Sequence, residues 1–232
     1  MVTVRPARER GHFDHGWLDT RHTFSFGDYH DPAHMGFGPL RAINEDVVAP
    51  GAGFARHLHH DMEIVTWVLE GELEHQDSLG HTSVIRRGLL QRMTAGTGIE
   101  HSEVNASQKL PVRLMQIWMR PDRPGHRPEY EQRHLPLPER RNKLRLAVSG
   151  DGADGSLRWH QDARLWVAEI SADVTLEHVL PPGRRAWIHV TGGRVAVNAV
   201  GLVAGDGAAI EDVSRIDLAA DGECALLLFD LP

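Results

Sequence analysis

Short segments in which apolar and polar residues alternate make up most of this chain. The segment after Glu63 reads IVTWVLEGELEHQ, an apolar and β-branched run that continues beyond Glu70–Gly71. Alternation with a period of two, interrupted by glycine, predicts β-strands joined by tight turns, and Glu70–Gly71 predicts a hairpin. Two further turns are predicted at Leu79–Gly80 and Arg87–Gly88. Because few segments show helical periodicity, the pattern predicts an all-β protein with few short helices.

The pattern of a strand, a glycine turn and a return strand occurs in both halves of the chain. WVLEGELEHQDSLG begins at Trp67, and WIHVTGGRVAVNAVG begins at Trp187. Such internal repetition predicts two copies of one barrel. Residues 121–143 are rich in proline and charge and lack periodicity, which is typical of a linker. We therefore expect three parts, which are an N-terminal domain at 1–130, a linker at 131–143 and a C-terminal domain at 144–232.

Composition and charge limit the classes of partner. The chain has 232 residues, of which 41% are hydrophobic, so it can bury a substantial core. A net charge of -7 and a pI of about 6.1 argue against direct binding to nucleic acid or to an anionic membrane. They do not exclude a protein partner. The single cysteine, Cys224, rules out an internal disulfide, and neither a secretory leader nor a membrane-spanning run is visible. We expect a cytoplasmic protein.

Two pairs of metal-ligand residues stand at strand spacing. His57 and His59 are two residues apart, as are His101 and Glu103. Residues i and i+2 of a strand point to the same face, so each pair can direct two donor groups at one point. Two such strands together would supply three imidazoles and a carboxylate. This ligand set suits a divalent transition metal better than calcium or magnesium, which prefer oxygen ligands.

The choice of carboxylate is open from spacing alone. Glu63 lies four residues after His59 and has the same strand parity, as does Asp61. Glu63 could bind the metal in place of Glu103, or it could lie behind the site and orient an imidazole. His60 has the opposite parity, so we expect it to face away.

The remaining histidines show no ligand spacing. His75 and His81 are expected to be exposed turn residues. The second half contains His178 and His189 but neither an H-x-H nor an H-x-E motif, so no metal site is expected there. The histidines near the N-terminus are scattered, and we expect them to be hydrogen-bonded or on the surface: His12, His15, His22, His30 and His34.

Several motifs resemble a known family. Gly51–Gly71 resembles the first cupin motif, and Gly88–Asn105 resembles the second. Over nearly its whole length the chain resembles the bicupins of the pirin family, in the compact bacterial branch that has quercetinase activity. Leu58 and His60 depart from the family, which commonly has proline and a basic residue there. The matching stretches are RGHFDHGWLDTRHTFSFGDYHDP, GFGPLRAINEDVV, HLHHDMEIVTWVLEGELEHQDSLG, MTAGTGIEHSE, PEYEQRHLP and LLLFDLP.

The resemblance implies a fold and a metal site. The fold would be two double-stranded β-helix (jelly-roll) barrels packed together, of which the C-terminal one is degenerate and metal-free. His57, His59, His101 and Glu103 would bind one divalent metal, with Glu63 in the shell behind them. The usual ion would be Fe(II), although Mn, Co, Ni, Cu or Zn are accepted by cupins of this type.

The resemblance also implies an activity. A dioxygenase would open the ring of a flavonol such as quercetin with O2 and release a depside and carbon monoxide. Glu103, or Glu63 behind it, would take the proton of the flavonol 3-hydroxyl. The family suggests an alternative, an iron-binding pirin that acts as a redox- or metal-responsive regulatory partner of other proteins. A further alternative is another cupin reaction such as sugar isomerisation, which would consume no oxygen. We expect a monomer.

Two segments supply candidate pocket residues. Phe24 and Phe26 share one face of a strand predicted at Thr23–Phe26, and LPVRLMQIWM carries Met115 and Trp118. We expect Phe24, Phe26, Met115 and Trp118 to form an apolar pocket beside the metal for the flat aromatic substrate.

Overall fold

The computed structural model describes residues 1–232 as two compact units. The N-terminal unit comprises Gly11–His134 together with Trp159–Gln161. The C-terminal unit comprises Met1–Arg10, Leu135–Arg158 and Asp162–Pro232. Strands dominate both, and the one α-helix is α1 (Leu137–Arg140), so the prediction of an all-β protein with few short helices is confirmed. No helix has the length and apolar character that crossing a membrane would require.

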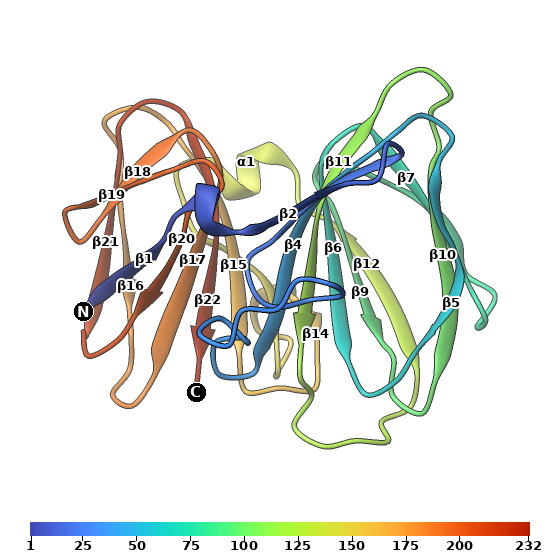
Figure 1. Ribbon diagram of the computed structural model, residues 1–232. Helices are drawn as coiled ribbons and strands as arrows, with labels where there is room; N and C mark the ends of the chain where they lie inside the picture. The colour runs from blue at the N-terminus through green and yellow to red at the C-terminus, as the bar shows by residue number, and fades with distance from the viewer. The chain divides into compact units, whose positions relative to one another are not determined.

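The N-terminal unit contains two antiparallel sheets, which stand opposite each other in Figure 1. The seven-stranded sheet has the order β12 (Glu129–His134), β9 (Leu89–Thr94), β6 (Glu63–Glu70), β11 (Val112–Met119), β4 (Leu40–Val48), β3 (Leu18–His22) and β2 (Gly11–Asp14). The four-stranded sheet has the order β5 (Gly53–His59), β10 (Ile99–Asn105), β7 (Glu72–Asp77) and β8 (Thr82–Arg86).

Apolar side chains from both sheets pack together in this unit. Val68 and Leu114 of the large sheet share one buried cluster with Leu73 and Ile85 of the small sheet. The alternation of apolar and polar residues produces this layer, because every second side chain of a strand points inward.

The glycine at position 71 joins two sheets. Strand β6 pairs with β9 and β11, whereas β7 pairs with β10 and β8, so the predicted hairpin at Glu70–Gly71 is wrong. Gly71 has φ +80°, and a Cβ there would lie 2.7 Å from the carbonyl oxygen of Pro111. Only glycine tolerates this conformation and this approach at low cost. The predicted turn at Leu79–Gly80 does connect a hairpin, formed by β7 and β8.

The C-terminal unit repeats the arrangement. Its seven-stranded sheet has the order β1 (Val2–Arg5), β20 (Gly207–Ile210), β17 (Arg185–Gly192), β22 (Cys224–Leu231), β15 (Arg164–Ile170), β13 (Arg145–Ser149) and β14 (Leu157–Arg158). Its four-stranded sheet has the order β16 (Thr175–Val179), β21 (Arg215–Ala220), β18 (Arg194–Val197) and β19 (Val200–Val203). Gly193, with φ +72°, again marks the crossing between sheets. The prediction of two copies of one barrel is confirmed.

Strand pairing divides the chain differently from the ranges 1–130, 131–143 and 144–232. Strand β1 pairs with β20, so the first residues belong to the C-terminal unit. Strand β12 lies at the corresponding edge of the N-terminal unit, beside β9, although most of it falls within the expected linker. Hydrogen bonds to distant strands decide these boundaries, and composition does not reveal them.

Candidate metal centre

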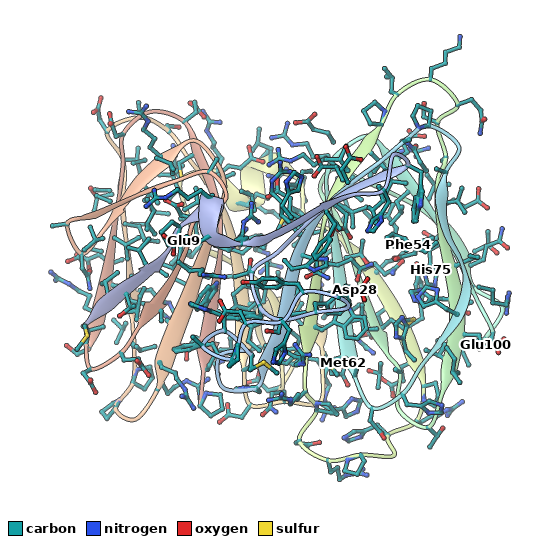
Figure 2. All side chains as sticks on the ribbon, in the orientation of Figure 1. Glu9, Asp28, Phe54, Met62, His75 and Glu100 are labelled. Atoms are coloured by element: carbon teal, nitrogen blue, oxygen red, sulfur yellow. The ribbon has the colours of Figure 1, made fainter.

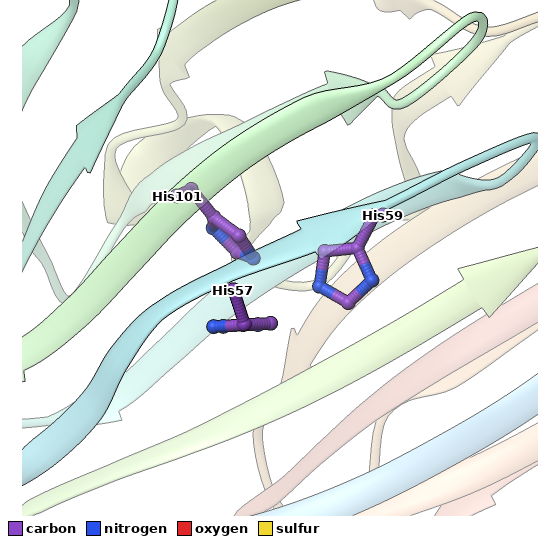
Figure 3. A group of neighbouring side chains, drawn as sticks. All are labelled: His57, His59 and His101. Atoms are coloured by element: carbon purple, nitrogen blue, oxygen red, sulfur yellow. The ribbon is translucent and has the colours of Figure 1, made fainter.

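Strands β5 and β10 carry the predicted ligand pairs side by side. They are neighbours in the small sheet, and His57 lies directly opposite His101 in the ladder. The predicted ligands are buried or half-buried, whereas Leu58, between His57 and His59, and Glu100, which precedes His101, are exposed. Figure 2 shows Glu100 on the outside of the unit, and Figure 3 shows three imidazoles that gather from the two strands.

The three imidazoles are close enough to share one ion. Ligand atoms of His57, His59 and His101 all lie within 4.8 Å of one another. The ring centroid of His101 is 4.5 Å from that of His57 and 4.8 Å from that of His59. The Nδ1 atom of His57 donates to the carbonyl oxygen of Ala55 at 2.7 Å, which leaves its Nε2 free to coordinate.

The surroundings of the His101 side chain favour a metal ion bound to its imidazole. It is only 1% exposed, yet neither ring nitrogen has a hydrogen-bond partner in the protein. An unpaired buried polar group costs about 1–3 kcal/mol. Coordination of a cation would satisfy one of these nitrogens, so the residues fit a metal.

The same surroundings keep two of the imidazoles, His59 and His101, neutral. Burial, together with His57, His59 and His75 nearby, lowers the pKa of His101 to about 2. Burial and the neighbouring His57 lower the pKa of His59 to about 4. Neutral imidazole is the form that binds metals, so both side chains are ready to coordinate at pH 7 without losing a proton.

Glu103 approaches the group from the next inward position of β10. Its ligand atom lies within 4.8 Å of those of His101 and His75, whereas the group formed by His57, His59 and His101 does not include it. Two side chains of the large sheet donate to its carboxylate, Thr66 to Oε1 at 3.2 Å and Gln116 to Oε2 at 2.5 Å. Burial raises the pKa of Glu103 to about 7.

His75 is a member of this cluster that the sequence did not identify. It is 0% exposed, so the prediction of an exposed turn residue is wrong. It lies opposite Glu103 in the ladder between β7 and β10, and its ring stacks on Tyr130 at 4.9 Å. Figure 2 shows it between the two sheets. Its parity offered a signal, because it shares a strand face with the apolar Leu73.

Glu63 lies outside the cluster. Its carboxylate accepts a hydrogen bond from Thr94 Oγ1 at 2.8 Å and pairs with His160 Nδ1 at 2.9 Å. The expected position behind a ligand imidazole is therefore wrong, since its imidazole partner is His160. Asp61, with φ +47°, turns the chain between β5 and β6, so strand parity does not continue from His59 to Glu63. His60 is exposed, as its opposite parity predicts.

A cavity of about 220 Å³ opens beside these residues, and we call it the metal-side cavity. Its wall includes two predicted pocket residues, Phe26 and Trp118, whose rings meet edge to face at 4.9 Å. Met115 has the opposite parity to Trp118 on β11 and is 0% exposed in the core. Phe24 is 1% exposed, because 23–26 forms no strand and its parity does not apply. The lining residues are Phe26, Asn44, Asp46, Phe54, His57, His59, His101, Glu103, Gln116 and Trp118.

Comparison with known proteins decides the family. The family model described as Pirin matches residues 3–119, and the model described as Quercetinase C-terminal cupin domain matches residues 146–231. The chain belongs to the pirin family. It is 47% identical over 232 residues to the Escherichia coli (strain K12) protein named Quercetin 2,3-dioxygenase, covering 100% of this chain and 99% of that one. It is 39% identical over 232 residues to a Caulobacter vibrioides protein named Pirin-like protein, covering 99% of each chain.

A solved structure supports the same conclusion. The Escherichia coli bacterial pirin YhhW in complex with nickel(II) superposes with a TM-score of 0.96 at 47% identity, covering 100% of this chain and 99% of that one. The resemblance to pirins and the bicupin fold that it implies are thereby confirmed.

In this member of the pirin family, polar side chains also form a row across the large sheet, at the level of Glu103. Strand register places them opposite one another in succession, and we call them the polar row: Gln91, Thr66, Gln116, Asn44 and His22. Thr66 and Gln116 of this row hold Glu103. No sequence spacing could reveal the row, because each member comes from a different strand.

Proposed function

We propose that this pirin is a metal-dependent dioxygenase that cleaves a flavonol such as quercetin with O2. The observation that carries the proposal is the buried His101 imidazole, which has no hydrogen-bond partner in the protein and meets His57 and His59 at a cavity with aromatic walls. The full-length identity of 47% to a protein named Quercetin 2,3-dioxygenase supports the substrate class.

The ligands that we propose are His57, His59, His101 and Glu103, and the ion is one divalent transition metal. We expect Fe(II), with Mn, Co, Ni, Cu and Zn as ions that the same set can hold. A bound divalent ion would supply Lewis-acid chemistry, which favours the oxyanion form of a substrate hydroxyl.

Glu103 is the residue that we assign as the proton acceptor. Its carboxylate lines the metal-side cavity, where a substrate hydroxyl would lie, and without a bound cation burial raises its pKa to about 7. Thr66 and Gln116 donate to its two oxygens and so hold the carboxylate in one orientation. Glu63 is paired with His160 and is therefore not our candidate for the base.

Aromatic side chains would hold and shield the substrate. Trp118 packs edge to face on His59 at 4.9 Å and on Phe26, and Phe54 completes the wall. A flat aromatic substrate buries its faces against such rings, which also exclude water from the reacting atoms.

Metal analysis coupled to oxygen uptake tests the proposal. The purified protein is expected to contain one divalent metal per chain and to consume O2 with quercetin. Chelation should abolish the uptake, and reloading with Fe(II) should restore it. Reloading with Mn, Co, Ni, Cu or Zn in parallel would rank the ions.

A ligand variant and a matched control make the test specific. His101→Ala should lose both the metal and the oxygen uptake. His60→Ala, which removes an exposed imidazole one residue from His59, should keep both. Full oxygen uptake by a demetallated His101→Ala protein would refute the proposal.

We further infer that the chain works as a monomer on a small aromatic substrate and O2, without direct contact to nucleic acid or membrane. The net charge of -7 supports this, because anionic partners are repelled and a protein partner would need a basic surface. Light scattering at several concentrations checks the oligomeric state.

A further inference from the structure

A second cavity, of about 180 Å³, lies beside the metal-side cavity. Four residues line both cavities, which are Phe26, Asn44, Asp46 and Phe54. The other residues that line the second cavity are Phe13, His15, Leu18, Thr20, His22, Gly27 and Asp28. The two cavities therefore share a wall, and that wall carries polar side chains of β4.

The sizes of the cavities suggest that one ligand uses both. Pockets for drug-sized ligands measure about 300–1,000 Å³. The metal-side cavity, at 220 Å³, and the second cavity, at 180 Å³, each fall short of that range. Together they reach it. A ligand with a chelating part and a separate ring would divide between them.

Asn44 stands at the junction with an unused hydrogen-bond acceptor. Its side chain is 4% exposed, and its Oδ1 has no hydrogen-bond partner in the protein. Its neighbours in the polar row are already engaged: Gln116 donates to Glu103, and His22 contacts Thr20 Oγ1 through Nε2 at 2.9 Å. A buried acceptor without a partner costs free energy, so a ligand that donates a hydrogen bond to this oxygen would be favoured.

The second cavity has the chemistry of a site for a hydroxylated ring. Aromatic rings form its walls, with His22 at 5.6 Å from Phe13 and 5.3 Å from Phe26. Thr20 donates to Asp46, so that carboxylate already has a partner. Asn44 Oδ1 is a fully buried acceptor of the shared wall that has no partner, and a phenolic hydroxyl is a donor that suits it.

We propose that the second cavity is a subsite for one aryl ring of the substrate, the ring that lies farther from the chelating hydroxyl. Asn44 favours substrates in which this ring carries a hydroxyl. Asn44 Oδ1 accepts the hydrogen bond of that hydroxyl, while the chelating part occupies the metal-side cavity. The identification of the ligand as a flavonol rests on the proposed function, whereas the hydroxyl selectivity rests on the cavities.

Paired ligands and a variant test this assignment. The ligands are 3-hydroxyflavone and 3,4′-dihydroxyflavone, which differ by one hydroxyl on the remote ring. The wild-type holoprotein should prefer the dihydroxy compound about tenfold in Kd and in kcat/KM, which equals about 1.4 kcal/mol. In Asn44→Leu, which replaces the amide with an apolar group of similar size, the preference should fall to about one, while 3-hydroxyflavone changes less than about threefold.

Thr23→Val is the matched control. Thr23 Oγ1 is also buried without a hydrogen-bond partner, but Thr23 lines neither cavity. This variant should keep the tenfold preference. An unchanged preference in Asn44→Leu, or an equal loss for both ligands, overturns the role of Asn44.

Binding measured without oxygen separates this inference from the proposed function. Calorimetry under anaerobic conditions gives Kd for both ligands, and oxygen uptake gives turnover. If the protein binds the dihydroxy compound more tightly but consumes no oxygen, the proposed dioxygenase activity is refuted and the proposed subsite is supported. If the protein consumes oxygen with both compounds and prefers neither, only the proposed subsite is refuted. If Asn44→Leu does not fold, equal affinity of the wild type for both ligands, or binding of neither, overturns the subsite.

Discussion

The four-stranded sheets of the two units have the same arrangement of strands but differ in the side chains that face the interior. Register gives the correspondence: Glu103 lies opposite His75, and Leu218 lies opposite Val197 at the matching place. In the same way His101 faces His57 across the ladder, whereas Ile216 faces His178. At two of the proposed ligand positions, those of His101 and Glu103, the other unit thus has the apolar Ile216 and Leu218.

The C-terminal interior is an apolar core at these positions. Ile216, Leu218 and Val197 are each 0% exposed and belong to one cluster. His178, the imidazole at the position that matches His57, pairs with Asp230 at 3.0 Å. Because Ile216 and Leu218 cannot coordinate a cation and His178 is paired with Asp230, we infer that the C-terminal unit is metal-free.

The large sheets differ in the same way. The polar row of the N-terminal unit contains Thr66 and Gln116, whereas a row across the C-terminal sheet reads Ala208, Ile188, Leu228 and Trp166. Burial of such side chains contributes about 25 cal/mol per Å² to stability. The apolar row adds to the core of the C-terminal unit, whereas the polar row of the N-terminal unit holds Glu103 through Thr66 and Gln116.

The largest expected effect comes from placing a carboxylate in the apolar unit. Leu218→Glu puts an unpaired charge where Glu103 stands in the other unit, without Thr66 and Gln116 to receive it. We expect it to lower the free energy of unfolding by more than about 4 kcal/mol. Urea denaturation followed by tryptophan fluorescence measures this, and a loss below about 1 kcal/mol would contradict the comparison.

The reverse exchange should remove function and spare the fold. His101→Ile introduces the apolar residue that stands at the matching C-terminal position. Changes behind metal ligands alone cost about 10–100-fold, so loss of a ligand should cost at least about 100-fold in metal affinity and oxygen uptake. The melting temperature of the metal-free protein should not fall, because an unpaired buried imidazole is removed. Metal analysis and calorimetry report the two results separately.

A carboxylate of the C-terminal unit should stabilise the protein at neutral pH. Asp230 pairs with Arg184 and His178, and hydrogen bonds from these side chains hold its pKa below the ordinary value despite burial. A lowered pKa contributes stability that is present above the unfolded-state value and is lost as pH falls through the folded-state value. Asp230→Asn should cost roughly 3–5 kcal/mol at pH 7 and less below about pH 4. A cost that does not change with pH would contradict this.

A carboxylate of the N-terminal unit should have the opposite pH dependence. Burial raises the pKa of Asp46 from 3.8 to about 6, although Thr20 donates to it. A raised pKa means that stability is present below pH 3.8 and is lost as pH rises through about 6. The free energy of unfolding of the wild type should therefore fall relative to that of Asp46→Asn by about 2 kcal/mol from pH 4 to pH 7. Urea midpoints at both pH values provide the check, and a shift toward the wild type would exclude the assignment.

Strand alternation and the two i, i+2 pairs could be predicted because they depend on local geometry alone. Side chains two residues apart share a face wherever a strand forms. The sequence therefore predicted that His57 and His59 point to one face of their strand, and that His101 and Glu103 do the same on theirs. Glu63 did not follow the rule, because a left-handed residue at Asp61 breaks the strand between it and His59.

By itself, then, the sequence determined most of the strands, the internal repeat and the two pairs of candidate ligands, since each depends on neighbours along the chain. Only the tertiary structure decided that Gly71 crosses between sheets, that His75 joins the cluster and that Asn44 lies beside Gln116 in a polar row. Those relations depend on which distant strands hydrogen-bond and in which register. Register is set by the packing of whole faces, and no short stretch of residues contains that information.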